Sequence, residues 1–203
     1  MKIEDPVTMA LLRKPNVIPW LHGDTRFLIP EGWKNVRPKI RIERESRWGR
    51  ELVGSRVSQQ THWMGPFGES IAYDLIKPWH GEAWKPITLG RCKPDWETEH
   101  VILEVKAGAH FVKGSIDDKV LGIPFKYLDV PQLYGKPLWI LCIGRVERVS
   151  RHLYGNLSGP CQTESHRETL AYWEERGIRF VGATELTFFS NALESDRLFT
   201  QRS

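Results

Sequence analysis

Three charged side chains in one short stretch have the types and spacing needed for metal-dependent hydrolysis. The stretch KPDWETEHVILEVKAG, residues 93–108, places Asp95 directly after a proline, and Glu104 and Lys106 at the end of an apolar run. Successive side chains of a strand point to opposite faces, so Glu104 and Lys106 share one face of a strand. A short turn after Asp95 can return the chain antiparallel, which places the Asp95 carboxylate alongside Glu104.

Two carboxylates beside a backbone carbonyl form a set of hard oxygen ligands. Asp95, Glu104 and the carbonyl of Val105 therefore predict a Mg²⁺ site, because Mg²⁺ prefers such ligands, keeps several waters and binds phosphate oxygens. We expect Mn²⁺ to substitute for it. Lys106 beside the metal can orient or deprotonate an attacking water, or stabilise charge that develops on phosphorus. The alternative is a surface hairpin whose charges are simply solvated.

Hydrophobic patterning predicts the elements that position these side chains. We expect a helix that opens after Gly68 and stops at Pro78, and then a strand pair that turns near residues 97–99. A short strand at 86–93 precedes this pair, whose second strand is Val101–Ala107. After the pair, in chain order, we expect a helix from Ser115 that ends before Pro131, a buried strand at 136–147, a helix at 165–176 capped by Ser165, a strand at 178–182 and a helix at 183–195. This order predicts the α/β class, with a mixed central sheet flanked by helices.

Composition is that of an ordinary soluble domain. The chain has 203 residues, of which 40% are hydrophobic and 27% charged, which predicts one domain with a real core. No apolar run approaches the roughly 20 residues that span a bilayer, and the first residues do not resemble a secretory signal. Three widely separated cysteines argue against a disulfide framework and a structural zinc site, so a cytoplasmic location is expected.

The first 65 residues differ from the rest. Residues 1–35 predict an irregular arm, and RPKIRIERES, residues 37–46, alternates like a half-buried strand with Ile40 and Ile42 on one face. Arginine suits bidentate contact with phosphate or guanine, so this basic strand region is predicted to contact DNA. Its candidate contacts are Arg37, Lys39, Arg41, Arg44, Arg47, Arg50 and Arg56. A solvated charged face is the alternative.

The motif Pro94-Asp95, eight residues, then Glu104-Val105-Lys106 resembles the PD-(D/E)xK nuclease superfamily, to which many restriction endonucleases belong. The resemblance covers about residues 65–145 and implies Mg²⁺-dependent hydrolysis of phosphodiesters on an αβββαβ core, so residues 66–203 are expected to form the nuclease core. It also implies that Glu69, on the first core helix, is an accessory catalytic and metal-binding acid. Glu82, in the loop that follows, is the alternative candidate for this accessory acid.

The segment KGSIDDK, residues 113–119, is similar to a stretch that follows the catalytic strand in some restriction enzymes. The similarity implies DNA contacts for Lys113, Ser115 and Lys119. Asp117 and Lys119 form a second acid-x-Lys pair, but the capping pattern Ser115–Asp118 favours a helix start there.

The resulting hypothesis is a Mg²⁺-dependent, sequence-specific endonuclease for double-stranded DNA, most similar to a small type II restriction enzyme. Such an enzyme is expected to be a homodimer if its target is palindromic. The motif does not separate this activity from that of a phage-type exonuclease, a junction resolvase or a nicking enzyme. A non-catalytic DNA-binding module on the same fold is the alternative from another functional class.

Overall fold

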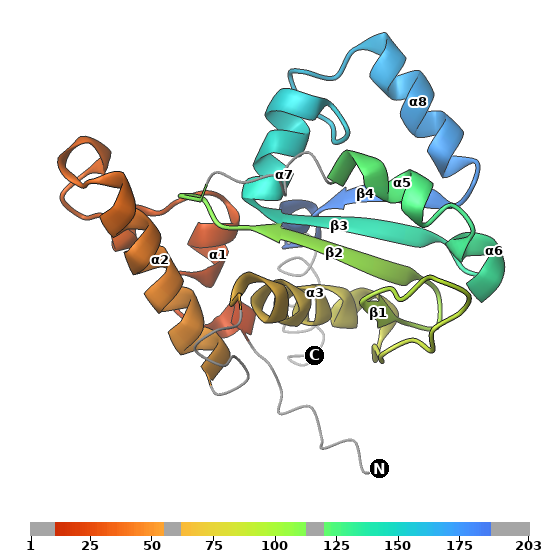
Figure 1. The fold of residues 1–203 in the computed structure, drawn as a ribbon, viewed down its shortest axis with the longest axis horizontal. Helices are drawn as coiled ribbons and strands as arrows, with labels where there is room; N and C mark the ends of the chain where they lie inside the picture. The colour runs from red at the N-terminus through yellow and green to blue at the C-terminus, as the bar shows by residue number, and fades with distance from the viewer. Residues whose placement is uncertain (1–10, 55–61, 113–119, 188–203) are drawn as a thin grey trace, which may run out of the picture.

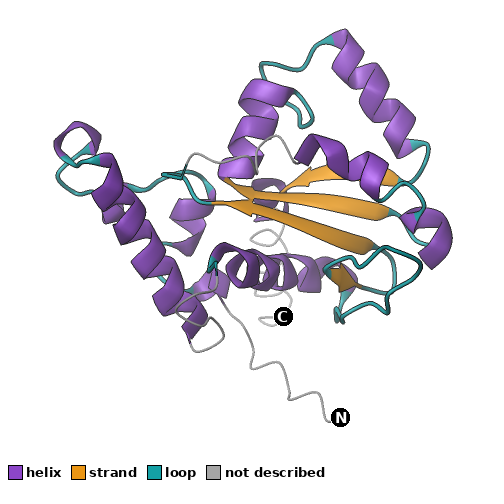
Figure 2. Cartoon of the chain, viewed as in Figure 1, coloured by secondary structure: helices purple, strands orange, loops and turns teal. Residues whose placement is uncertain are grey.

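One mixed sheet lies between layers of helices in the computed structural model, which describes residues 11–54, 62–112 and 120–187 (Figures 1 and 2). Its four strands lie side by side in chain order: β1 (Trp96–Glu97), β2 (Ile102–Gly108), β3 (Leu138–Gly144) and β4 (Ile178–Gly182). β1 runs antiparallel to β2, and β3 and β4 continue parallel to β2. The predicted α/β class with a mixed, helix-flanked sheet is therefore confirmed.

Helices cover both faces of this sheet. The α-helical segments with described ends are α1 (Val17–Leu21), α2 (Pro38–Val53), α3 (Met64–His80), α5 (Ile123–Lys126), α6 (Val130–Tyr134), α7 (Arg145–Val149) and α8 (Glu164–Glu174), with a π-helical turn η6 (Ser150–Tyr154) after α7. Residues 183–187 are helical, as predicted for 183–195, and the rest of that range lies outside the described residues. Short 3₁₀ turns are η1 (Leu11–Arg13), η2 (Arg26–Leu28), η3 (Trp33–Asn35) and η5 (Val120–Gly122). Figure 1 shows α3 along one face of the sheet and α5 along the other.

Strand β2 faces two different environments. Leu103, Val105 and Ala107 pack against α3, where a Cβ added to Gly68 would lie 2.5 Å from the Ala107 Cβ. This close approach of helix and strand explains a glycine in the second turn of α3. Glu104 and Lys106 alternate with those residues, so they lie on the opposite face, where α5 packs. The predicted separation of charged and apolar faces therefore holds.

The helix that carries Glu69 is longer than the sequence predicts. α3 begins at Met64 instead of after Gly68, because Pro66 lies in its first turn, where a missing backbone N–H costs nothing. It also continues past Pro78 to His80, and Gly81 follows as its C-cap with a φ of 71°, which suits glycine. Glu69 consequently lies in the second turn of α3 and not in the first.

Several smaller predictions at element boundaries were wrong. The short strand expected at residues 86–93 is replaced by a turn closed by a single bridge between Leu89 and Cys92. The helix expected to end before Pro131 is broken into η5, α5 and α6, and α6 continues through Pro131 because proline is tolerated in a first turn. The start expected at Ser115 lies outside the described residues. α8 is capped by Thr163, not Ser165. Strands β3 and β4 fall within the predicted ranges.

The basic segment predicted as a strand is the helix α2. Its inward side chains are spaced by four, from Arg41 through Glu45 and Gly49 to Val53, which is the period of a helix and not of a strand. A Cβ on Gly49 would lie 2.1 Å from the Trp63 ring, so this glycine lets α2 pack closely. The alternation of two isoleucines was misleading, because Ile40 is 39% exposed.

Glu45 joins α2 to the end of β2. Its carboxylate accepts hydrogen bonds from Trp20 Nε1 at 2.8 Å, His110 N at 2.7 Å and Phe111 N at 3.0 Å. The side chain is 1% exposed, and the Trp20 ring packs beside it against Phe67. The segments before and after residue 65 therefore share one core.

Glu45→Ala is expected to lower the free energy of unfolding by about 3–5 kcal/mol, because three donors lose their buried acceptor. Urea unfolding monitored by circular dichroism measures this loss. Glu43→Ala, at an exposed position of the same helix, is the matched control and should change stability by less than about 0.5 kcal/mol. Equal effects of the two substitutions would show that Glu45 does not anchor α2.

Across the described ranges, no helix has the length and apolar character needed to cross a membrane.

Candidate active site

The antiparallel return brings Asp95 to Glu104. β1 pairs with β2 in the register Trp96 to Leu103, which sets the preceding Asp95 opposite Glu104. The Asp95 amide donates to the Leu103 carbonyl at 2.9 Å, and Asp95 Oδ2 accepts from the Val105 amide at 2.7 Å. Because the N–H and C=O of one strand residue point to the same side, the Val105 carbonyl lies on the edge that Asp95 occupies.

The Glu104 carboxylate acts electrostatically on Asp95. Burial, and then the negative charge of Glu104, raise the pKa of Asp95 to about 6, against the opposing effect of the Val105 N–H. Glu104 is only 3% exposed, and its Oε2 is buried with no hydrogen-bond partner in the described part of the chain. A buried carboxylate oxygen without a partner is costly, and a cation at this place would satisfy it.

Lys106 lies next to Glu104 on the same face of β2. Its ammonium donates a short hydrogen bond to Glu104 Oε1, and its side chain remains 24% exposed. One N–H of the ammonium is therefore engaged with Glu104, while the exposed part of the group can meet solvent or substrate. The strand alternation expected from the sequence places these two side chains together.

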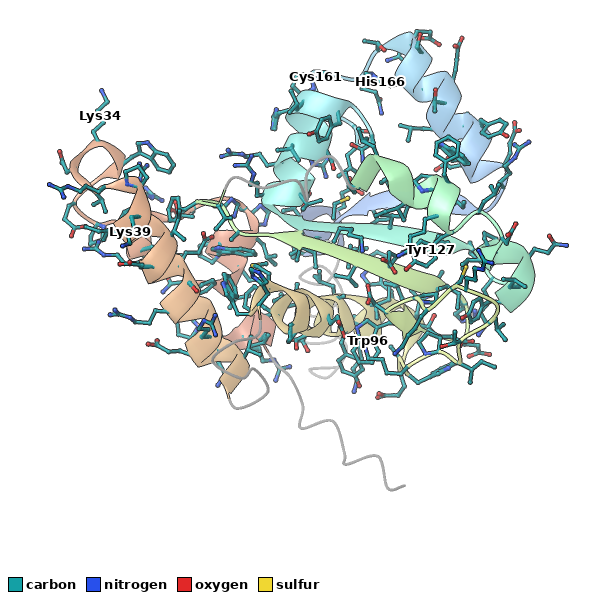
Figure 3. The ribbon with its side chains drawn as sticks, viewed as in Figure 1. Lys34, Lys39, Trp96, Tyr127, Cys161 and His166 are labelled. Atoms are coloured by element: carbon teal, nitrogen blue, oxygen red, sulfur yellow. The ribbon has the colours of Figure 1, made fainter. Side chains whose placement is uncertain are left out.

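Tyr127, at the end of α5, is a neighbour of this site that the sequence did not indicate. Burial of the Tyr127 phenol, followed by the negative charge of Glu104 and a side-chain interaction of the hydroxyl with that carboxylate, raises the pKa of Tyr127. The Tyr127 hydroxyl therefore lies near Glu104, although it is too far for a well-formed hydrogen bond to Oε2. Lys126 donates to the Tyr127 hydroxyl at 3.1 Å. Figure 3 shows Tyr127 on the α5 side of the sheet and Trp96 on the α3 side. An aromatic residue therefore lies near the site on each face of the sheet.

Glu69 reaches the site through a network with Lys85 and Trp96. Lys85 Nζ donates to Glu69 Oε2 at 2.5 Å and to the Asp95 carbonyl at 2.9 Å, and it lies 4.0 Å from the centre of the Trp96 ring. Trp96 Nε1 donates to the Glu69 carbonyl at 2.9 Å. The Glu69 carboxylate therefore contacts a lysine, which was another residue missed from the sequence.

Glu82, the alternative candidate to Glu69, has different contact partners. It accepts from Tyr73 Oη at 2.6 Å and pairs with Lys77 at 2.7 Å. These two partners hold Glu82 beside the last turns of α3. Of the two acids, Glu69 is the one whose charge raises the Asp95 pKa.

A Mg²⁺ ion would have two carboxylates and one carbonyl to bind here. Within the described residues, no group of three or more His, Cys, Asp or Glu side chains is arranged to hold a metal. The set that fits is smaller: Asp95, the unpartnered Oε2 of Glu104 and the Val105 carbonyl. Such a set suits Mg²⁺, which is commonly held by one or two carboxylates with several waters. The residues present therefore fit the ion, with Glu69 as a more distant acid neutralised by Lys85.

The predicted DNA-binding side chains of α2 point in several directions. Arg41 is buried and stacks 3.8 Å over the Trp33 ring, and its Nε and Nη1 have no hydrogen-bond partner among residues whose positions are described. Arg44 pairs with Glu31 at 2.8 Å and donates to the Leu28 carbonyl at 3.1 Å. Helix formation thus buries Arg41 against Trp33 and ties Arg44 to an acid.

The remaining basic residues of α2 are exposed or half-buried. Arg37, Lys39 and Arg47 are exposed, and Arg50 is half-buried with its Nε near Ser46 Oγ at 3.4 Å. Lys39 and Arg47 alternate with Glu43 and Glu51 at spacings of four, which is typical of a solvated helix face. Acidic and basic side chains therefore lie next to each other on the exposed face of the helix, whereas the predicted strand would have gathered basic side chains on one face. Arg56, Lys113, Ser115 and Lys119 lie outside the described residues.

Comparisons with protein-family models, with curated proteins and with solved structures find no match for this chain. Any assignment of function must therefore be carried by the chain's own residues.

Proposed function

We propose that the protein is a Mg²⁺-dependent phosphodiesterase that cleaves double-stranded DNA, with Asp95, Glu104 and Lys106 at its centre. The observation that supports it most is the pairing of β1 with β2, which gathers two acids, a carbonyl and a lysine around β2. A parallel strand follows β2 through the α5–α6 crossover, whereas two strands, β1 and β2, stand between α3 and α5 where an αβββαβ core has three. Chance charges on an exposed hairpin would be solvated, whereas Glu104 is buried.

The electrostatics of the acids support a cation at this place. Burial and then the neighbouring charge of Glu104 disfavour the charged form of Asp95 and raise its pKa. Asp95, Glu104 and the Val105 carbonyl would hold the ion, and Mn²⁺ would replace Mg²⁺. When bound, the metal would supply a Lewis acid and lower the pKa of a coordinated water.

Lys106 and Glu69 would have different roles. The Lys106 ammonium, anchored on Glu104, has donors left to hold a water in position for attack or to stabilise a phosphate oxygen. Glu69 would act indirectly, because Lys85 joins it to the Asp95 backbone and so sets the position of that residue. The proposed enzyme is cytoplasmic and dimeric if its target is palindromic.

Incubation with supercoiled plasmid and linear phage DNA, in Mg²⁺ or in chelator, tests the proposal. A sequence-specific endonuclease gives discrete bands, an exonuclease a smear from linear DNA, and a nickase only open circles, while a resolvase prefers branched DNA. DNA binding without cutting on any of these substrates would identify a non-catalytic module and contradict the proposed activity.

The exposed side of α2 provides a separate test of the DNA contact. If Lys39 and Arg47 each neutralise one phosphate, the double variant Lys39→Ala/Arg47→Ala should reduce the slope of log K against log salt by about 2. Binding is measured in chelator over a range of salt concentrations, with Lys14→Ala, an exposed lysine, as the control. An unchanged slope would remove α2 from the DNA-binding surface and leave the cleavage site unaffected.

A further inference from the structure

The tryptophan of η3 is covered on one face and open on the other. Trp33 is 57% exposed, although tryptophan is on average a highly buried residue. The Arg41 guanidinium lies 3.8 Å from the centre of the Trp33 ring, and the Phe111 ring meets it at 5.4 Å with planes at 49°. Because Arg41 covers one face, so large an exposed fraction means that the opposite face of the Trp33 ring is open to solvent.

Arg41 carries a positive charge that no acid neutralises in the described part of the chain. The side chain is 9% exposed, and its Nε and Nη1 have no hydrogen-bond partner there. Glu45, one turn further along α2, accepts from Trp20 Nε1 and from two backbone amides instead. A buried charge without a partner is costly. An anion near Trp33 would lower this cost through its charge, without touching the enclosed Nε and Nη1.

The surface around the Trp33 ring is basic. Lys34, Arg37 and Lys39 are exposed, and the stretch WKNVRPKIR, residues 33–41, contains no acid. Figure 3 shows Lys34 and Lys39 at the end of the molecule where η3 leads into α2. Glu31, the acid just before this stretch, pairs with Arg44 at 2.8 Å. An open aromatic face beside unneutralised cations suits a ligand that is both planar and negatively charged.

We propose that Trp33 is a stacking platform for an unpaired base of single-stranded DNA, whose phosphates Lys34 and Arg37 bind. In a duplex both faces of a base are covered by its neighbours, so an unpaired base is the one that can lie flat on the ring. Aromatic faces beside a basic surface are the means by which proteins bind single strands. A cationic ligand, which an aromatic face also attracts, is disfavoured because the Arg41 charge already lies on the ring.

The stacking platform is connected to the proposed active site through the end of β2. Phe111 follows Lys106 by five residues, which span at most about 17 Å when extended. Each nucleotide of a stacked strand advances about 3.4 Å, so the unpaired base would lie within roughly five to seven nucleotides of the cleaved bond. This inference rests on the proposed function, because it assigns to the DNA substrate a single-stranded segment near the cleavage site.

Anisotropy titrations of the full chain in chelator test the stacking platform without metal or cleavage. The probes are a fluorescein-labelled single strand of about 12 nucleotides and the blunt duplex of the same sequence. Trp33→Ala should weaken binding of the single strand at least about tenfold, which is within the range for loss of one base stacked on an aromatic ring. Binding of the duplex should weaken much less, because most of its bases have no free face.

Two further tryptophan variants are the controls. Trp33→Phe keeps an aromatic face and should lose less affinity for the single strand than Trp33→Ala. Trp79→Ala removes another exposed tryptophan, in the last turn of α3, and should bind like the wild type. Thermal melting checks that all three variants fold. Wild-type affinity of Trp33→Ala for the single strand, or equal losses in Trp33→Ala and Trp79→Ala, would overturn the proposal.

Arg41→Met separates the charge of Arg41 from its packing. If the Arg41 charge neutralises one phosphate, this variant should reduce the slope of log K against log salt for the single strand by about 0.7. Its melting temperature should not fall, because a buried charge without a partner has been removed. A lower melting temperature with an unchanged slope would show that Arg41 only packs beneath Trp33, and would overturn its role in binding the strand.

Plasmid cleavage in Mg²⁺ distinguishes a failure of this inference from a failure of the proposed function. If the wild type cuts plasmid but Trp33→Ala keeps its affinity for the single strand, the stacking platform is wrong and the nuclease stands. If the wild type binds the single strand through Trp33 but cuts no DNA, the nuclease is wrong and the stacking platform stands. Tighter binding of RNA of the same sequence would overturn the assignment to DNA.

Discussion

Glu104→Gln is expected to lower Mg²⁺-dependent DNA cleavage by at least about 1,000-fold. A catalytic metal contributes several kcal/mol to transition-state stabilisation, and each 1.36 kcal/mol is worth about tenfold in rate. Glutamine keeps the side-chain volume and an oxygen that can accept from Lys106, but it removes the charge that would hold the ion. Cleavage of supercoiled plasmid under single-turnover conditions measures the effect.

Glutamine is a better test here than alanine, and Glu104 a better target than Lys106. Lys106→Ala would leave the Glu104 charge buried and unpaired, at a cost of about 3–5 kcal/mol in stability, so lost activity could reflect lost folding. Glu104→Gln leaves Lys106 with partial access to solvent. Glu168→Gln, an exposed acid of α8, is the matched control and should cleave like the wild type. Wild-type cleavage by Glu104→Gln would contradict the assignment of the active site to Glu104.

The arrangement of Asp95, Glu104 and Lys106 could be predicted because it depends on local rules. Glu104 and Lys106 share a face through the two-residue period of a strand, and Asp95 is returned by a turn only a few residues long. The buried strands β3 and β4 were also recognisable, since their apolar runs are short and continuous. These features need only neighbouring residues, which a single sequence provides.

The rest depends on contacts between distant residues. α2 was predicted as a strand because Ile40 and Ile42 alternate with charged residues. So short an alternation fits a helix equally well. The partners that distinguish them, Trp63 against Gly49 and Trp20 with His110 on Glu45, are far away in the chain. Lys85 reaches Glu69 because the adjacent Trp84 pairs with Glu97, a bridge without a sequence signature.

Asp95→Asn is expected to stabilise the folded protein at pH 8 while it abolishes cleavage. Asp95 has a pKa of about 6 in the folded chain against an ordinary value of 3.8, so the folded state binds the proton more tightly. Stability gained by protonation is therefore present at pH 4 and is lost as the pH rises through about 6. A shift of this size corresponds to about 2–3 kcal/mol, which the neutral asparagine should recover at pH 8.

Asp74 is the matched control, because burial raises its pKa to about 6 as well. Asp74 accepts from the Leu12 amide at 3.2 Å, and asparagine can keep that bond, just as the asparagine of Asp95→Asn can accept from the Val105 amide. Urea unfolding in chelator should show both variants stabilised at pH 8 and both close to the wild type at pH 4. Only Asp95→Asn should lose cleavage.

Added Mg²⁺ separates the two aspartates by a further measurement. A ligand that binds only the folded state stabilises it by RT ln(1 + [L]/Kd), about 2.7 kcal/mol at 100 times Kd. Mg²⁺ at pH 8 should therefore raise the melting temperature of the wild type and of Asp74→Asn, but not that of Asp95→Asn. Below pH 6 the wild-type response should shrink, because a proton then competes with the ion for Asp95. Equal Mg²⁺ stabilisation of all three proteins would mean that the Asp95 charge repels Glu104 without serving to hold a metal.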